Sequence, residues 1–302
     1  IKQWIAEGAK WPEGIALRYK SPEELKAIAD LQAKLPTLKR LEILPEKFSL
    51  ETKRDAHRVI VFATFQDATT KDVSGLCDLK VVDPKIATLS GLDLKPVADA
   101  GATELTATLG GQTVKAQIEV KGGQQDRPIS FRLDCMPVFM RGGCNQGGCH
   151  GAARGKDGFR TSLFGMDPAG DFIRITREMP GRRLNLAIPE ESALIEKAVG
   201  AVPHSGNQCF EPDSIYNKTL IEWIANGAPD DRADVAKCTG IEVYPKQVVL
   251  EGKNATQKIT VRATYSDGTD RDVTNLALFM SNNNPTAPTP KNGPVTSGDR
   301  GA

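Results

Sequence analysis

The sequence predicts a multi-domain chain in which all-β sandwiches alternate with a small, mainly α-helical and loop-rich unit. Three observations lead to this fold class. One stretch of the chain repeats itself 200 residues later, the repeated stretch is rich in β-branched and aromatic residues, and the region between the copies is rich in Gly, Arg and Pro. At 302 residues the chain is long enough for two or three domains of about 100–150 residues each.

The first 40 residues precede the repeat. The segment WIAEGA at Trp4 echoes WIANGA at Trp223, which ends the middle region. We therefore interpret residues 1–14 as the C-terminal tail of a preceding domain similar to the middle region. Residues 15–40 are predicted to be a helical linker, because Ser21-Pro22-Glu23-Glu24 is a typical N-terminal cap for a helix.

The repeat itself has the composition of β-strands. LEILPEKFSLETKRDAHRVIVFATFQDATTKDVSGL, from Leu41, aligns without a gap with IEVYPKQVVLEGKNATQKITVRATYSDGTDRDVTNL, from Ile241. Each copy contains a run of β-branched and aromatic residues followed by a turn with Asp at its start. Residues 41–121 are thus predicted to form a complete β-sandwich. His57, at the start of a strand, is expected on the solvated surface.

The second copy, residues 238–302, is expected to be a truncated sandwich. The sequence ends at the position equivalent to Ala102, before the last two strands predicted for the first copy. Donor-strand completion by a neighbouring molecule is the alternative. Between the copies, residues 127–232 are predicted to contain short helices at 190–198 and 214–226, the latter ending at Gly227.

Charge and cysteine content limit the classes of partner and the compartment. Lys and Arg number 39 against 38 Asp and Glu, so net charge does not indicate nucleic acid or an anionic membrane. No apolar run approaches the roughly 18–20 residues that span a bilayer. The six cysteines are scattered except for one close pair, which favours an oxidising compartment over a zinc ribbon.

The close cysteine pair lies in the motif C-x4-C-H, formed by Cys144, Cys149 and His150. A c-type haem needs two thiols to add across its vinyl groups and an imidazole directly after the second thiol. The usual spacing has two intervening residues, and Gly147 and Gly148 supply the freedom that four require. Three other readings stay open: a zinc site, a Cys144–Cys149 disulfide, and a reactive Cys149–His150 pair.

The middle region resembles the planctomycete-type cytochrome c domain, which occurs in large secreted proteins alternating with Ig-like domains. The resemblance rests on GCNQGGCHG around the motif and on AVPHSGN further along. The matching segments are residues 131–165, 167–172, 181–195, 201–207 and 214–229. The flanking units resemble bacterial Ig-like domains of group 2 through the pattern ATYSDGTDRDVT and its counterpart in the first copy.

This resemblance implies one covalent haem c, attached through Cys144 and Cys149, with His150 as an axial iron ligand. His204 matches the late histidine of the family, which implies that it is the second axial ligand. The segment after it departs from the family pattern, because Ser205 and Asn207 interrupt a glycine-rich stretch. Other possibilities are an open position that binds a small gas or a methionine ligand. The methionines concerned are Met136, Met140, Met166 and Met179.

Further side chains are expected around the haem. Met136 and Met140 are expected to pack on the porphyrin. Arg141 and Arg154 are expected to hold propionates or to form a solvated face, together with other arginines of the region. These other arginines are Arg160, Arg182 and Arg183. Cys135 and Cys209 lie where the family pattern has no cysteine, so a Cys135–Cys209 disulfide is expected, and a Cys77–Cys238 bridge is considered.

The sequence therefore predicts a periplasmic, secreted or cell-surface electron-transfer protein rather than an enzyme. Its redox partners would be neighbouring domains or copies of the same protein. No paired carboxylates, Ser-His-Asp set or phosphate-binding loop has supporting context. The alternative is a scaffold or adhesion segment built of Ig-like domains, in which haem is secondary or absent.

Overall fold

A computed structural model of the chain describes residues 20–179, 181–288 and 294–298. The predicted tail at residues 1–14 lies outside this part. Strands occupy two ranges, 38–121 and 238–296, and all but one of the described helices lie between them, at 131–225. The described chain is mostly β, in several sheets, which is compatible with β-sandwich domains.

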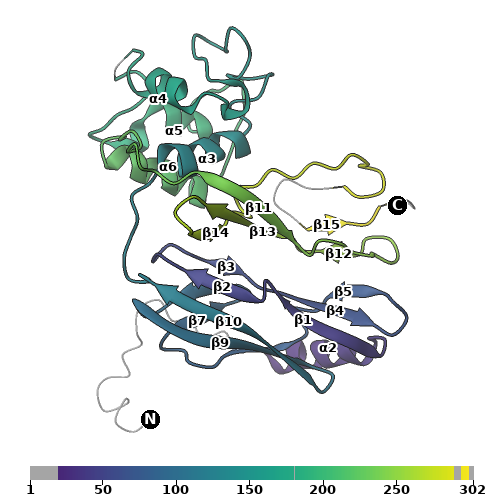
Figure 1. The fold of residues 1–302 in the computed structure, drawn as a ribbon. Coiled ribbons are helices and arrows are strands. Elements are labelled where there is room, and N and C mark those ends of the chain that lie inside the picture. The colour runs from purple at the N-terminus through teal and green to yellow at the C-terminus, as the bar shows by residue number, and fades with distance from the viewer. Residues whose placement is uncertain (1–19, 180, 289–293, 299–302) are drawn as a thin grey trace.

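The first β unit consists of three small sheets around one core (Figure 1). Its strands are β1 (Leu38–Leu44), β2 (Lys47–Leu50), β3 (His57–Arg58), β4 (Ile60–Phe65), β5 (Thr70–Asp72), β6 (Asp78–Val81), β7 (Ala87–Ser90), β8 (Asp93–Pro96), β9 (Ala100–Leu109) and β10 (Gln112–Lys121). The sheet orders are β1-β4-β5, β2-β10-β9-β6 and β3-β8-β7. The long β9–β10 hairpin turns at Gly110 and Gly111, both with positive φ, as this tight turn requires. Phe48, Leu50 and Ile118 are fully buried between the sheets.

The helix α2 (Pro22–Ala33) precedes this unit and begins at the predicted cap. The Ser21 hydroxyl accepts a hydrogen bond from the Glu24 amide, and the Glu24 carboxylate accepts one from the Ser21 amide. The capping box predicted from the sequence is therefore confirmed. None of the residues of α2 is buried.

The helical unit packs short helices around an aromatic core. Its elements are η1 (Phe131–Cys135), α3 (Met136–Arg141), η2 (Leu163–Gly165), α4 (Pro168–Thr176), η3 (Pro189–Glu191), α5 (Ala193–Ala198) and α6 (Ile215–Ala225). Trp223 is fully buried, its ring centroid lies 5.2 Å from that of Phe131, and its indole N–H donates to the Pro229 carbonyl. Helix α6 is capped by Ser214, and Gly227 follows it with φ of 87°. Among the described helices none has the length and apolar character needed to cross a membrane.

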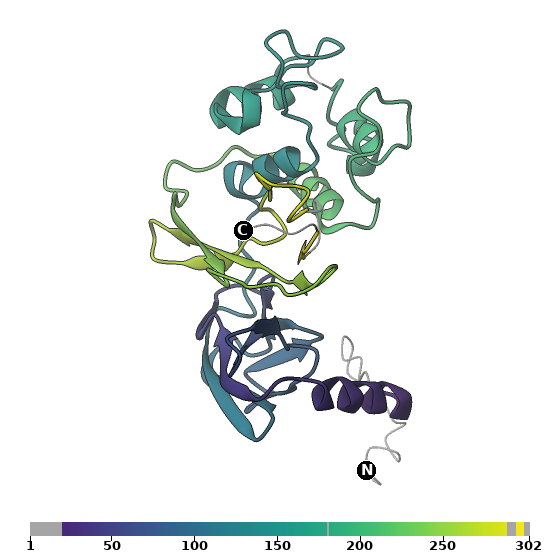
Figure 2. The same cartoon turned by 90° about the vertical axis from the view of Figure 1, so that its right-hand side faces the viewer.

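The second β unit repeats only part of the first. Its strands are β11 (Cys238–Tyr244), β12 (Thr256–Gln257), β13 (Thr260–Tyr265), β14 (Asp270–Asp272) and β15 (Val295–Thr296). They form the sheets β11-β13-β14 and β12-β15. In Figures 1 and 2 this unit, although last in the sequence, lies between the helical unit and the first β unit. The Tyr216 hydroxyl donates to the Asn275 carbonyl, and the Arg58 amide donates to Asp272.

This arrangement corrects the expectation for His57. The side chain is only 2% exposed, because β14 of the second β unit packs against β3. Its ring lies edge-on to Phe48, with centroids 6.2 Å apart. The strand position alone indicates a surface residue, and the cover comes from a segment some 200 residues away in the sequence.

Candidate functional site

The C-x4-C-H motif forms a closed loop directly after α3. The Cys144 amide donates to the Phe139 carbonyl of that helix, and the His150 amide donates back to the Cys144 carbonyl at 3.0 Å. A Cβ at Gly151 would overlap the Asn145 carbonyl, so the loop can close this tightly only with glycine there. The loop thereby fixes the backbone on both sides of Cys149.

His150 is oriented by a hairpin that follows the motif. Its Nδ1 lies 3.1 Å from the Phe159 carbonyl, which can only accept, so Nδ1 carries the proton and Nε2 keeps its lone pair. Phe159 belongs to a tight turn with Lys156, in which Asp157 and Gly158 both have positive φ. Burial lowers the pKa of His150, and the nearby His204 lowers that pKa further. The imidazole is thus held neutral with Nε2 available to a ligand.

His204 is oriented in the same way by its own loop. Its Nδ1 lies 3.0 Å from the Asn207 carbonyl, which again leaves the lone pair on Nε2. Asn207 takes a positive φ of 57°, a conformation that asparagine tolerates and that glycine would otherwise supply. The Ser205 hydroxyl donates to Asp157 at 3.0 Å and so ties this loop to the hairpin behind His150. The two residues that interrupt the glycine-rich stretch therefore have structural roles.

The two loops bring the rings of His150 and His204 close together. The ring centroids of His150 and His204 are 6.2 Å apart, and the ring planes are within 9° of parallel. In both rings Nδ1 faces a backbone carbonyl, which is the arrangement that usually fixes the tautomer of a metal-ligating histidine. The two histidines are 54 positions apart in the sequence, which gives no local reason for this contact, so it is a product of the tertiary fold.

Both histidines line a cavity of about 360 Å³ in the helical unit. Its wall has an apolar part and a basic part, which is typical of a site for an amphipathic ligand. The apolar part includes Phe139, Phe159, Leu194 and Leu220, and the basic part consists of Lys156, Arg182, Arg183 and Lys197. Cys144 and Cys209 contribute sulfur atoms to the same wall.

The basic wall differs in part from the one expected. Arg182 and Arg183 are in the set of arginines that the sequence singles out, whereas Lys156 and Lys197 are not. The guanidinium of Arg183 lies 4.6 Å above the Phe159 ring and donates to the Arg174 and Glu178 carbonyls, so it connects the end of α4 to the hairpin. The position of Lys197 on α5 gives no signal in the sequence, because the wall is assembled from three separate segments.

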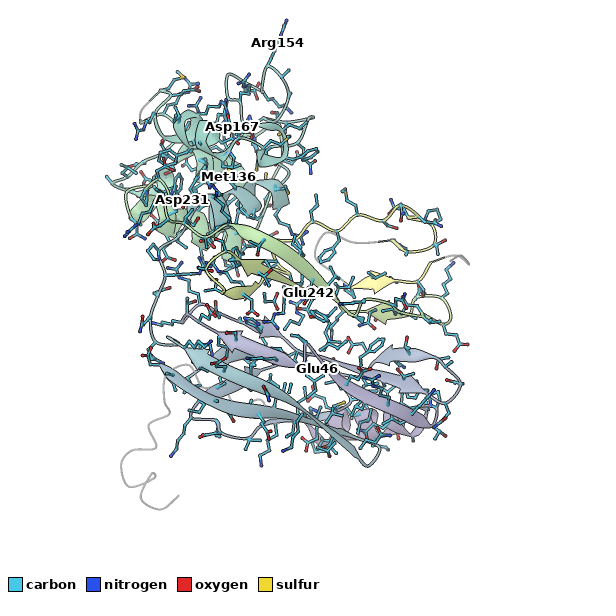
Figure 3. The ribbon with its side chains drawn as sticks, in the orientation of Figure 1. Glu46, Met136, Arg154, Asp167, Asp231 and Glu242 are labelled. Carbon is cyan, nitrogen blue, oxygen red and sulfur yellow. The ribbon has the colours of Figure 1, made fainter. Side chains whose placement is uncertain are left out.

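Four residues expected around the haem have no place in this wall. Met136 is 6% exposed in the core of the helical unit, and Met140 is half-buried. Arg141 is buried and donates to the Tyr216 hydroxyl, and it lines a different cavity, between the helical unit and the two β units. Arg154 is exposed and extends away from the fold (Figure 3). Their proximity to the motif in sequence is not matched by proximity to the cavity.

The remaining methionines separate into two cases. Met166 is 82% exposed and does not line the cavity, whereas Met179 is 53% exposed and does. Met179 is thus the methionine among the expected alternatives that the fold places beside the histidine pair.

The contacts of the cysteines differ from the expected disulfides. All six lie in the described residues, and the structure contains no disulfide among them. Cys135 is fully buried in the helical core and Cys77 in the first β core, where burial raises the pKa of the Cys77 thiol to about 12. Cys209 contacts Cys144 instead of Cys135, with the sulfurs 3.9 Å apart. The expected Cys135–Cys209 and Cys77–Cys238 bridges are therefore not formed.

Cys149, the second thiol of the motif, is half-buried and is not among the residues that line the cavity. Its amide donates to the Gln146 carbonyl within the loop. By contrast, Cys144 lies in the wall, and the contact with Cys209 together with burial raises the pKa of its thiol well above the ordinary value. The two motif cysteines thus have different surroundings.

Comparison with known proteins identifies no relative, since no family model matches the chain and a search of curated proteins finds no match. Within the described residues, no three His, Cys, Asp or Glu side chains lie close enough together to hold a metal ion by themselves.

Proposed function

We propose that this chain is a secreted c-type cytochrome segment that transfers electrons through one haem. The haem would be attached covalently through Cys144 and Cys149, with His150 and His204 as the axial pair. It would lie in the cavity of the helical unit, while the β units hold that unit at a fixed position in a larger extracellular or periplasmic protein. The compartment follows from the chemistry of attachment, and the redox partner would be a neighbouring domain or a second copy.

The close approach of the two histidines is the observation that supports this proposal most directly. His150 and His204 would together hold the iron, because each ring keeps the lone pair on Nε2 and the two ring centroids lie close together in one cavity. The observed separation is 6.2 Å, with the rings almost parallel and both Nδ1 atoms on backbone carbonyls. Two imidazoles leave the equatorial positions of the iron to a macrocycle, which suits a haem.

The other residues of the wall fit the rest of such a group. Phe139, Leu194 and Leu220 offer an apolar surface to a flat macrocycle. Arg182, Lys156 and Lys197 offer positive charge to carboxylates at its edge. When bound, the haem iron supplies one-electron chemistry, whose potential the axial ligands and the burial of the site set. The chain itself binds the group, orients it and limits the access of water.

The test of attachment is a pyridine haemochrome spectrum of the chain after denaturation, made in a host that attaches haem in its periplasm. Covalent haem remains with the unfolded chain, so the spectrum is expected in the wild type. It should be lost in the Cys144→Ser, Cys149→Ser double variant. A wild-type chain without covalent haem would overturn the proposal and leave the scaffold or adhesion function as the alternative.

The axial pair is tested by His204→Ala, with His57→Gln as the matched control. His57 is the remaining histidine of the chain and lies in the first β unit, far along the sequence from the cavity. The control should keep the low-spin absorption spectrum of the wild type, whereas His204→Ala should lose it. An unchanged spectrum in His204→Ala would contradict the assignment, and Met179→Leu would then test the methionine beside the pair.

A further inference from the structure

Two cysteines far apart in the sequence meet in the cavity wall. Cys144 belongs to the motif loop, and Cys209 follows the loop that carries His204. Their sulfur atoms are 3.9 Å apart, with the Cys144 thiol donating to the sulfur of Cys209. The proposed haem attachment uses Cys144 but gives Cys209 no role, so the contact requires a separate explanation.

The backbone on both sides of this contact is anchored. The Cys144 amide donates to the Phe139 carbonyl, and the Cys144 carbonyl accepts from the His150 amide. The Cys209 amide donates to the Ala198 carbonyl at 2.8 Å. These bonds hold the backbone of Cys144 and Cys209 in place on both sides of the contact.

Gly142 is packed tightly against both cysteines. A Cβ at this position would lie 3.1 Å from the Cys144 sulfur and 3.4 Å from the Cys209 Cβ. The glycine therefore allows the two side chains to approach each other beneath the helix α3, and a larger residue would separate them. The contact between Cys144 and Cys209 thus depends on the hydrogen bonds of both cysteines and on the small size of Gly142.

We propose that Cys144 and Cys209 form a reversible disulfide in the wall of the cavity, and that this disulfide withdraws Cys144 from attachment to haem. The second half of the proposal rests on the proposed function, whereas the first half does not. Cys144 would thus have two competing fates: a thioether to the haem or a disulfide to Cys209.

The disulfide would form by exchange with a small-molecule disulfide such as oxidised glutathione. One protein thiolate attacks a sulfur of that disulfide, a mixed disulfide forms, and one glutathione thiolate leaves. The second protein thiolate then attacks the protein sulfur of the mixed disulfide and releases the second glutathione thiolate. The protein thiols lose two electrons, the small disulfide gains them, and the two protons pass to the released thiolates.

The geometry favours Cys209 over Cys149 as the partner of Cys144. Closing a disulfide requires the sulfurs to approach to about 2.05 Å with suitably directed Cβ atoms. Cys209 is already in contact with Cys144, and the structure gives no such contact between Cys144 and Cys149.

The disulfide is tested on the haem-free chain equilibrated with oxidised glutathione and then alkylated and digested with trypsin without reduction. The expected product links the peptide 142–154, through Cys144, to the peptide 198–218. Cys149→Ser should keep this product, and Cys209→Ser should lose it. A bond between Cys144 and Cys149 within one peptide, or alkylation of both Cys144 and Cys209, would overturn the proposal.

The competition is tested separately by the yield of covalent haem. In an oxidising compartment, Cys209→Ser should carry several-fold more covalent haem per chain than the wild type, and added reductant should remove the difference. Equal yields would contradict the competition. If neither protein carries haem, the proposed function fails, while the peptide map of the haem-free chain still decides whether the disulfide exists.

Discussion

The two copies of the β unit have similar turns and strands but differ in the burial of their first strand. Both contain a cis proline after the first strand, at Pro45 and Pro245. In both, an aspartate accepts hydrogen bonds from the threonine two residues on, at Thr69 and Thr269. Yet Leu41 is 4% exposed, and its equivalent Ile241 is 65% exposed.

The difference comes from the opposing sheet. In the first copy, β2 pairs in parallel with β10, and the sheet β2-β10-β9-β6 provides the other side of the core. In the second copy, residues 247–250, equivalent to β2, form no strand, and no counterpart of the β9–β10 hairpin is present in the described residues. The repeated sequence thus determines turns and strands, whereas the burial of the first strand depends on strands outside the repeat.

The largest effect expected from this comparison is on core substitutions at equivalent positions. Leu41→Ala should lower the free energy of unfolding of the first β unit by about 2–5 kcal/mol, because it leaves a cavity in a closed core. Ile241→Ala should cost less than about 1 kcal/mol, since its side chain is mostly in solvent. Hydrogen exchange of each unit in a urea series measures both, and equal losses would contradict the comparison.

The same distinction explains how much of the fold could be predicted. The capping box of α2, the β9–β10 hairpin and the repeated strands each depend on residues near one another in sequence, and each was predictable. The exposure of Ile241 and the burial of His57 were not, because both depend on what packs against the strand. A strand pattern indicates which face is apolar but not which segment covers it.

In the candidate site too, the residues that local sequence indicates differ from those that only the tertiary fold brings together. Cys144, His150 and His204, which line the cavity, could be named from the sequence, because the spacing and the family resemblance mark them individually. Lys156, Lys197 and the Cys144–Cys209 contact could not, since three loops and a helix bring them together. Arg154 shows the opposite error, because it is close to the motif in sequence and extends into solvent (Figure 3).

A pH dependence should distinguish the two copies at the position of His57, whose equivalent is Gln257. Desolvation by burial lowers the pKa of His57, and this outweighs the opposing effect of Asp272 and Asp55, while Arg262 lowers that pKa too. The folded state therefore favours the neutral ring. Its contribution to stability is complete above the unfolded pKa of about 6.5 and is lost as the pH falls from there toward the folded pKa.

The measurement is the urea midpoint of the first β unit between about pH 7.5 and about pH 5.5. We expect the midpoint to fall on acidification in the wild type and to fall less in His57→Gln, which places the residue of the second copy at this position. The variant removes the titration and the ring contact with Phe48, and only the titration makes stability depend on pH. An equal fall in both proteins would assign the pH dependence to the carboxylates.

The smallest effect concerns the turn after β4 and its equivalent after β13. Ala68 has φ of 65° and Gly268 has φ of 82°, so the same left-handed position is filled by different residues. Ala68→Gly should stabilise the first unit by up to about 1 kcal/mol, and Gly268→Ala should destabilise the second by about 1 kcal/mol. Urea midpoints of the single variants measure the two signs. Because turn geometry is local, these effects should be similar in size in the closed and the open copy, unlike those of the core substitutions.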